Sequence, residues 1–204
     1  MPDWCDTRMT IEGPKDQVEN IRKLISQWTS KNYAKNDFGH RWLGNIVLGA
    51  GFSYEGENGL SCRGKITEIE EVEEKDPETY YFQLYYISAW EDVSETWQII
   101  LEKFAPNCKM YYCAEELDGD YFVTNDKNKR YYEEECIIDS YLEETNPMKK
   151  KWNFDEWEYI DRKTLKEKLS QIFGSMSLPK LIEKTKNLPL TDEEWVKIHV
   201  IEYV

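Results

Sequence analysis

Cysteine and histidine are the side chains that could support nucleophilic or metal chemistry in this chain, which has five cysteines and two histidines. A cysteine nucleophile needs a base within hydrogen-bond reach. His40 and Cys62 form the one pair to consider for an enzyme, although no spacing motif supports it, and His199 lies near the end of the chain. Cys108 and Cys113 are separated by four residues, but no second Cys/His pair completes a zinc site. We therefore predict no catalytic centre and no metal site.

A glycine-rich stretch, "GAGFSYEGENG" at residues 49–59, is the segment closest to a phosphate-binding loop. It lacks the Gly-Lys-Ser/Thr ending of such loops and does not open an evident helix. We interpret it as a flexible hairpin or rim loop, and we expect no cofactor.

Tyrosine is the side chain whose arrangement does suggest a binding surface. Four Tyr-Tyr pairs occur, at 80–81, 85–86, 111–112 and 131–132, each in a predicted strand. Neighbouring residues of a strand face opposite sides of the sheet, so each pair places one ring on each face. Such a face could stack nucleic-acid bases or contact a protein, and the alternative is that the C-terminal helices bury it. The predicted binding residues are Tyr81, Tyr85, Tyr112, Tyr131 and Trp90.

The elements that position these rings follow from periodicity. Alternation over residues 8–12 predicts a strand, and apolar residues at helical spacing over 14–28 predict a helix. A second helix follows from Asp92 and Glu95, which resemble a capping box, and from the apolar stripe up to Phe104. Further strands are expected at 63–73 (bulged), 80–90, 109–117, 120–125 and 129–139. This order predicts an α+β fold with a ferredoxin-like antiparallel sheet, two helices on one face and extra strands.

Two regions fall outside this pattern. Residues 31–60 hold six of the ten glycines and show little periodicity, and a long excursion of this kind is often functional. Residues 141–204 read as a helical C-terminal extension packed on a first domain at 1–140, with a last helix around Trp195 and Ile198 after a capping box at Thr191 and Glu194.

Charge and hydropathy bound the partners and the location. The chain has 40 acidic against 26 basic residues, a net charge of −14, and its one basic run is 149–151. Nucleic-acid binders usually carry a basic patch, so we expect a protein partner, basic in character, and not nucleic acid. No stretch approaches the roughly 18 apolar residues of a membrane helix, and the first residues do not resemble a secretory signal. We expect no membrane contact, and a cytoplasmic protein with reduced thiols.

The beginning of the chain resembles that of a known family. "MPDWC", followed by "RMTIEGP" and an amphipathic helix, and later "CRGKI" and "SAW…ETWQIILEKFAPNCKMYYCAEELDGDYF", resemble the YubB-like family of phage- and plasmid-encoded proteins. The resemblance covers about residues 1–139. It implies a ferredoxin-like domain, a cytoplasmic setting and association with mobile elements, without an activity. In this chain Trp4 and Cys5 are the predicted structural anchor of the terminal strand, since burial of both would hold the segment in place.

These observations favour a non-enzymatic, acidic protein-interaction protein. The first alternative is a sheet-based binder of single-stranded nucleic acid or of a small ligand. The second is an enzyme that uses Cys62 and His40.

Overall fold

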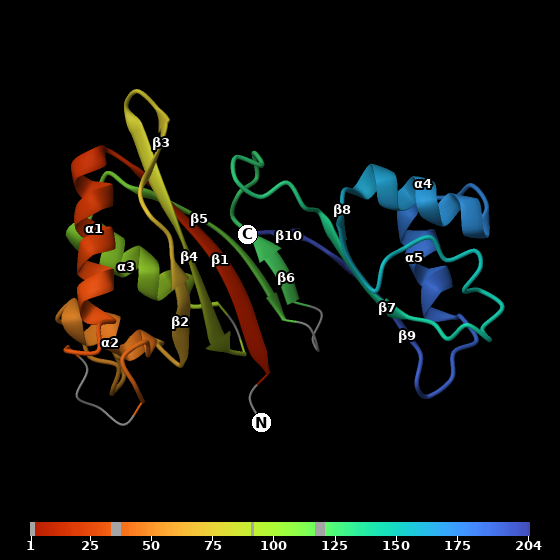
Figure 1. The fold of residues 1–204 in the computed structure, drawn as a ribbon, viewed down its shortest axis with the longest axis horizontal. Helices are drawn as coiled ribbons and strands as arrows, with labels where there is room; N and C mark the ends of the chain where they lie inside the picture. Colours follow the sequence, from red (N-terminus) through yellow and green to blue (C-terminus); the bar gives the residue numbers. More distant parts are fainter. Residues whose placement is uncertain (1–2, 34–37, 91, 117–120) are drawn as a thin grey trace. The chain divides into compact units, whose positions relative to one another are not determined.

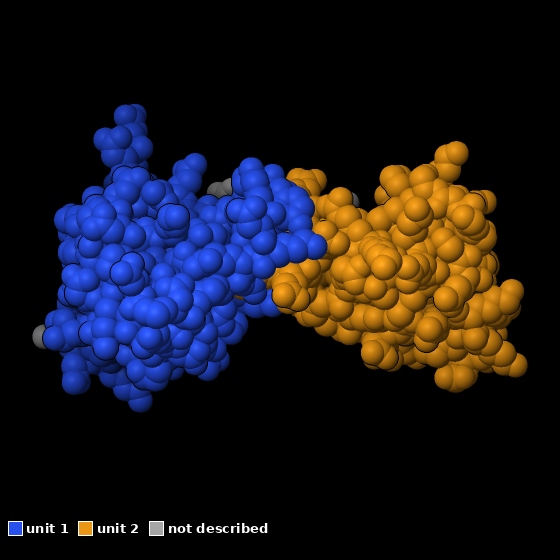
Figure 2. Space-filling view, turned by 90° about the horizontal axis from the view of Figure 1, so that it is seen from above, with its two compact units in different colours: residues 1–131, 203–204 blue, residues 132–202 orange. Residues whose placement is uncertain are grey.

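The computed structural model describes residues 3–33, 38–90, 92–116 and 121–204. They form a mixed α+β fold with five helices and two sheets (Figure 1). The chain divides into two compact units, which Figure 2 colours separately: unit 1 is residues 1–131 with 203–204, and unit 2 is residues 132–202. No helix in the described ranges is long and apolar enough to cross a membrane.

Unit 1 is built on an antiparallel sheet. Its strands run in the order β6-β5-β1-β4-β2, β3 pairs with β4, and the short β10 lies beside β6. The elements are β1 (Trp4–Gly13), α1 (Lys15–Trp28), α2 (Leu43–Gly49), β2 (Gly64–Ile69), β3 (Glu73–Asp76), β4 (Thr79–Ala89), α3 (Ser94–Phe104), β5 (Lys109–Glu116), β6 (Tyr121–Thr124) and β10 (Glu202–Tyr203).

One face of this sheet carries the core of unit 1. Cys5, Met9 and Ile11 of β1 are buried on this face, and the apolar stripes of α1 and α3 cover them (Figure 1). The helices pack this way because their apolar residues recur every three to four positions, as the sequence predicts. Trp97 of α3 is the largest fully buried side chain. Packing on one face leaves the other face free of helices from unit 1.

The strand predicted at 63–73 is confirmed over 64–69, with its bulge, and residues 70–72 interrupt it. β2 and β4 pair antiparallel, and their register shifts between Ile66 and Glu68. β3 then begins at Glu73 and pairs with the same strand. The run of glutamates in this region therefore lies at the edge of the sheet, where charge discourages pairing with other chains.

The excursion at 31–60 contains a helix that periodicity does not predict. α2 buries Leu43, Ile46 and Val47, although glycine disfavours helix by about 1 kcal/mol. Its two end glycines are needed for packing: a Cβ at Gly44 would lie 2.3 Å from the ring of Trp42, and one at Gly49 would lie 2.4 Å from the ring of Trp28. The glycines that suggest a loop are instead the positions where indole rings rest on a helix.

Unit 2 has its own sheet and core. Its strands run in the order β8-β7-β9, all antiparallel, and two helices pack on one face. The elements are β7 (Cys136–Tyr141), β8 (Trp157–Ile160), α4 (Arg162–Phe173), α5 (Leu178–Lys186) and β9 (Trp195–Val200). The carboxylate of Asp161 caps α4 by accepting from the N–H groups of Lys163 and Thr164, and Gly174, with φ 87°, ends it. Leu165, Leu169 and Leu181 are fully buried in this core.

The predicted last helix around Trp195 and Ile198 is wrong, because residues 195–200 form strand β9. The Thr191–Glu194 interaction does occur, since the Glu194 carboxylate accepts from the Thr191 N–H at 3.0 Å. The same carboxylate also accepts from the Glu143 N–H and from the Asn146 amide. It therefore ties two loops of unit 2 together and does not begin a helix.

Candidate functional site

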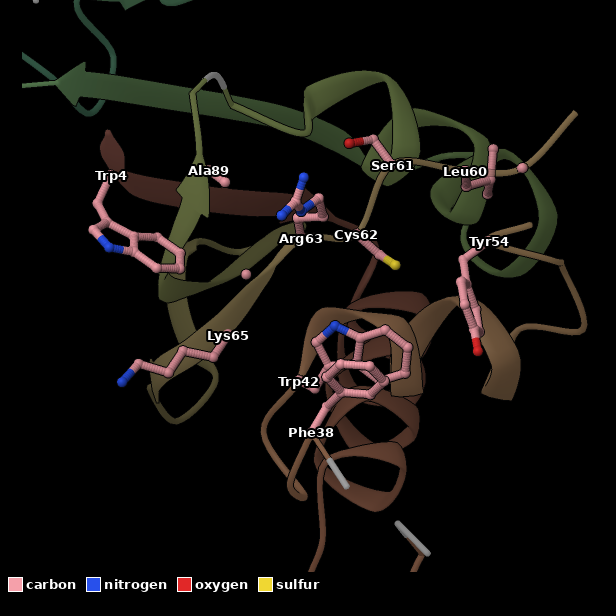
Figure 3. A pocket seen from close by; sticks show the side chains of 12 residues that line it. Trp4, Phe38, Trp42, Tyr54, Leu60, Ser61, Cys62, Arg63, Lys65 and Ala89 are labelled. Carbon is pink, nitrogen blue, oxygen red and sulfur yellow. The ribbon is translucent and has the colours of Figure 1, made fainter. Parts of the chain in front are cut away.

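A cavity of about 700 Å³ opens at one end of the unit 1 sheet, and aromatic side chains form much of its wall (Figure 3). Its volume is that of a typical small-molecule site. Contributions come from β1, from the 31–60 excursion and from the segment that leads into β2. The lining residues are Trp4, Phe38, Trp42, Tyr54, Gly59, Leu60, Ser61, Cys62, Arg63, Gly64, Lys65 and Ala89. We refer to it as the aromatic cavity.

Trp42 is the centre of the aromatic wall. Its ring centroid lies 4.5 Å from that of Phe38 and 5.1 Å from that of Tyr54, the second pair being edge to face. These are attractive geometries for aromatic pairs. Backbone contacts hold Trp42 in place: it forms an antiparallel bridge with Lys65, and the Ile66 N–H donates to the Arg41 carbonyl at 2.9 Å. The excursion is thereby fastened to the edge of the sheet.

The floor of the cavity is the start of β2, which lies very close to β4. A Cβ at Gly64 would lie 2.1 Å from the Ile87 carbonyl oxygen, so only glycine fits there. Cys62 is buried beside it, and burial raises the pKa of its thiol to about 11. The thiol therefore stays protonated at neutral pH.

Exposed aromatic rings line the cavity or stack on a residue that lines it. Phe38 is 68% exposed and Trp4 47% exposed, and Trp90, at the end of β4, is 50% exposed. Large apolar side chains that gather at one exposed place commonly mark a binding site. Trp90 has φ 69°, an uncommon backbone conformation for a bulky residue, and its ring lies 4.4 Å from the guanidinium of Arg63.

The predicted anchor at the N-terminus is half right. Cys5 is fully buried, and burial raises the pKa of its thiol to about 12. The predicted burial of Trp4 is wrong, since its side chain lines the aromatic cavity. The backbone holds this segment instead: Trp4 pairs with Ala89, and the Trp90 N–H donates to the Asp3 carbonyl at 2.8 Å.

The structure places Tyr81 and Tyr85 on one face of the sheet as predicted, but Tyr112 lies elsewhere, and Tyr131 lies before β7 and not in the strand predicted at 129–139. Tyr81 and Tyr85 pair with Glu12 and Arg8, whose side chains lie on the face of the sheet away from α1 and α3. Tyr112 pairs with the buried Met9 and is itself only 6% exposed, so it belongs to the core and not to this face. Its neighbour Tyr111 lies on the tyrosine face in its place, because β5 has the opposite register to the one we assumed. We call this surface, with Tyr81, Tyr85, Tyr111 and Tyr131, the tyrosine face.

The hydroxyl groups of this face are already engaged. Tyr81 donates to Glu73 at 2.6 Å and Tyr85 donates to Glu70 at 3.2 Å. The hydrogen bond from Tyr81 to Glu73, with burial, raises the pKa of Tyr81 to about 12. Polar groups paired in this way give a ligand few unsatisfied donors or acceptors.

Glu12 gathers the remaining groups of the tyrosine face into one network. Its carboxylate accepts from the Arg130 Nε at 2.6 Å, from the Tyr131 hydroxyl at 2.5 Å and from the Tyr111 hydroxyl at 3.3 Å. Lys75 adds a cation 3.5 Å from the centre of the Tyr131 ring. Arg130 and Tyr131 thus cover this end of the tyrosine face. We interpret the network as structural, because its hydrogen bonds to Glu12 hold these two residues on the sheet.

The Cys62–His40 pair is not brought together. Cys62 lines the aromatic cavity, whereas His40 lines a separate cavity with Arg41 and Ile69. Burial raises the pKa of the Cys62 thiol, so this thiol also lacks the thiolate character of a reactive cysteine. Among the residues that the structure describes, no group of three or more His, Cys, Asp and Glu side chains could hold a metal ion.

Several aromatic residues of these surfaces were not predicted as site residues. Phe38, Trp42 and Tyr54 lie in the glycine-rich excursion, and the one signal for them was aromatic residues in a long loop. Unit 2 adds a second set on the sheet face opposite its helices, which contains Tyr141, Trp157, Tyr159 and Trp195, each 36–43% exposed. This set was missed because residues 141–204 were read as a helical extension, whereas they include strands β8 and β9.

Comparison with family models, curated proteins and solved structures finds no match. The resemblance to the YubB-like family stays a prediction.

Proposed function

We propose that this chain is a non-enzymatic binding protein and that the aromatic cavity of unit 1 is its recognition site for a small ligand. The observation that carries the proposal is the convergence of Trp4, Phe38, Trp42 and Tyr54 on one concavity of about 700 Å³. Binding sites for small molecules are typically concave and aromatic-lined, with a few polar groups that fix orientation.

The cavity favours a small ligand over the protein partner that the acidic composition suggests. A protein interface needs an extended surface, ordinarily about 800 Å² on each partner. The tyrosine face would be the natural candidate, yet the Tyr81 and Tyr85 hydroxyls are bound to glutamates and Tyr131 belongs to the Glu12 network. The aromatic cavity instead presents rings at its mouth and keeps its one thiol protonated, which suits binding and not catalysis.

The fold supports the same reading. We infer that unit 1 is a ferredoxin-like domain, because the strand order β5-β1-β4-β2, with α1 after β1 and α3 after β4, is the order of that fold. The excursion between α1 and β2 is the addition to it, and it supplies three of the four aromatic rings of the cavity. The binding site is accordingly an elaboration of the scaffold, as functional sites commonly are.

The test is capture from cell extract with three matched forms of the chain. Wild type, Trp4→Ala and Trp195→Ala are immobilised, and mass spectrometry identifies retained small molecules and proteins with and without nuclease. Trp4 and Trp195 are 47% and 43% exposed, so loss of either removes a similar apolar surface. We expect a small molecule that wild type and Trp195→Ala retain and Trp4→Ala releases. Equal retention by all three forms, or retention that disappears with nuclease, would contradict the proposal.

A further inference from the structure

The charge of the aromatic cavity is opposite to that of the chain. The chain carries a net charge of −14, yet the charged residues among those that line the cavity are Arg63 and Lys65. Neither side chain has an ion pair in the part of the chain that the structure describes. A concavity lined by one sign of charge attracts ligands of the other sign.

Arg63 is the better placed of the two cations. Figure 3 shows it at the cavity between Trp4 and Trp42, whereas the Lys65 side chain extends away from the centre. The ring of Trp90, 4.4 Å from the guanidinium, supports it from one side. An arginine that stacks on an aromatic ring, and that has no carboxylate partner among the residues that the structure describes, keeps its planar set of donors for a carboxylate or phosphate oxygen.

A second cavity, lined in part by acidic residues, lies nearby. It shares Gly59 to Ser61 with the aromatic cavity and includes Asp92 and Glu95. The Asp92 carboxylate already accepts from the Tyr121 hydroxyl at 2.5 Å and from the Ser94 N–H at 2.7 Å. Its oxygens are thus engaged by neighbouring groups of unit 1, and neither Asp92 nor Glu95 is among the residues that line the aromatic cavity.

We propose that the ligand of the aromatic cavity is a flat aromatic anion, a ring system the size of an indole or purine that carries one carboxylate or phosphate group. The ring stacks on the exposed Trp4 side of the cavity, and the anionic group binds the Arg63 guanidinium. Stacking of a ring on an aromatic side chain contributes about 1–3 kcal/mol. This inference rests on the proposed function, since it names the chemistry of the ligand for that site.

Three probes of nearly equal shape test the charge: indole-3-acetate, the neutral indole-3-acetamide and the cationic tryptamine. Titrations followed by saturation-transfer difference NMR give the affinity of each for the full chain. We expect the acetate to bind about tenfold more tightly than the amide, and tryptamine to bind most weakly. Arg63→Gln should abolish the difference between acetate and amide, Trp4→Ala should weaken all three, and Trp195→Ala should change none.

Each other outcome would overturn one part of the proposal. Equal affinity of acetate and amide, or tightest binding of tryptamine, would show that the ligand is not an anion. If that binding still depends on Trp4, the aromatic cavity is upheld as a binding site. Absence of saturable binding by all three at millimolar concentration would overturn the aromatic anion as the ligand. The capture experiment, which assumes no ligand charge, then decides the proposed function separately.

Discussion

Replacement of Glu12 by glutamine tests whether the hydrogen-bond network on the tyrosine face stabilises unit 1. The side chain is 9% exposed and accepts hydrogen bonds from Arg130 and Tyr131. The Glu12→Gln variant keeps one acceptor oxygen at this position but loses the charge, and a hydrogen bond to a charged group contributes about 1 kcal/mol more than a neutral one. With two strong hydrogen bonds weakened, the free energy of unfolding should fall by about 2 kcal/mol at pH 7.

The pH dependence gives the sharper check. Burial alone raises the pKa of Glu12, but the hydrogen bonds from Tyr131 and Arg130 outweigh it, so the pKa lies below its ordinary value of 4.5. Ionised Glu12 therefore stabilises the folded state fully above that value, and the contribution is lost as the pH falls through the lower folded pKa. Wild type and Glu12→Gln should differ at pH 7, and the difference should shrink as the pH falls below 4.5.

The assay is urea unfolding of the full chain, with hydrogen exchange of β1 and β5 peptides to assign the transition to unit 1. Glu71→Gln is the matched control, because Glu71 also pairs with an arginine, Arg22, but is 86% exposed. Exposed pairs contribute less than about 1 kcal/mol. Equal losses in both variants, or a Glu12→Gln loss that persists unchanged at low pH, would refute the reasoning.

Three further outcomes follow from the same structure. Cys62, whose thiol pKa is raised to about 11, should resist iodoacetamide at pH 7.5 in the folded chain and react after unfolding, as measured by peptide mass spectrometry; rapid labelling of the native chain would restore the cysteine hypothesis. Gly64→Ala should destabilise the chain by about 1–3 kcal/mol in thermal unfolding, because the new Cβ meets the Ile87 carbonyl, and an unchanged transition would contradict that packing. Tyr81 should ionise with a pKa of about 12 in ultraviolet titration, and Glu73→Gln should lower it; no change would show that the hydrogen bond is not its cause.

Local patterns predicted most of unit 1 because its elements agree with their own periodicity. The helix at 14–28 and the helix ending at Phe104 have apolar stripes that fit a sheet face, so tertiary contacts confirm what the sequence alone indicates. The tyrosine pairs show the limit of this reasoning. Alternation requires one ring of each pair on each face, but only the pairing of Met9 with Tyr112 decides which ring that is. Register is a property of two strands, and one strand's sequence leaves it open.

The helix predicted around residues 195–200 is wrong for a related reason. The Thr191–Glu194 interaction is local and resembles a helix start, whereas the strand is stabilised by a ladder with β7, more than fifty residues away, from Cys136↔Val200 to Tyr141↔Trp195. Contacts of this range outweigh a weak helical preference. The segment also alternates between apolar and polar residues, and β-branched Val196, Ile198 and Val200 suit a strand that packs on one face.

The aromatic cavity could not be predicted because the residues that line it, from Trp4 to Ala89, lie far apart in the sequence. Trp4 reaches it through the antiparallel pairing of β1 with β4, and Trp42 reaches it through a single bridge to Lys65 at the sheet edge. Arg63 and Trp90 stand on neighbouring strand ends and meet only because β2 and β4 are paired. A set of aromatic rings spread along the sequence thus becomes a site through strand pairing. This explains why the glycine-rich excursion, which looks least structured, contributes the most to the cavity: its glycines allow the close approaches that bring the rings to the edge of a rigid sheet.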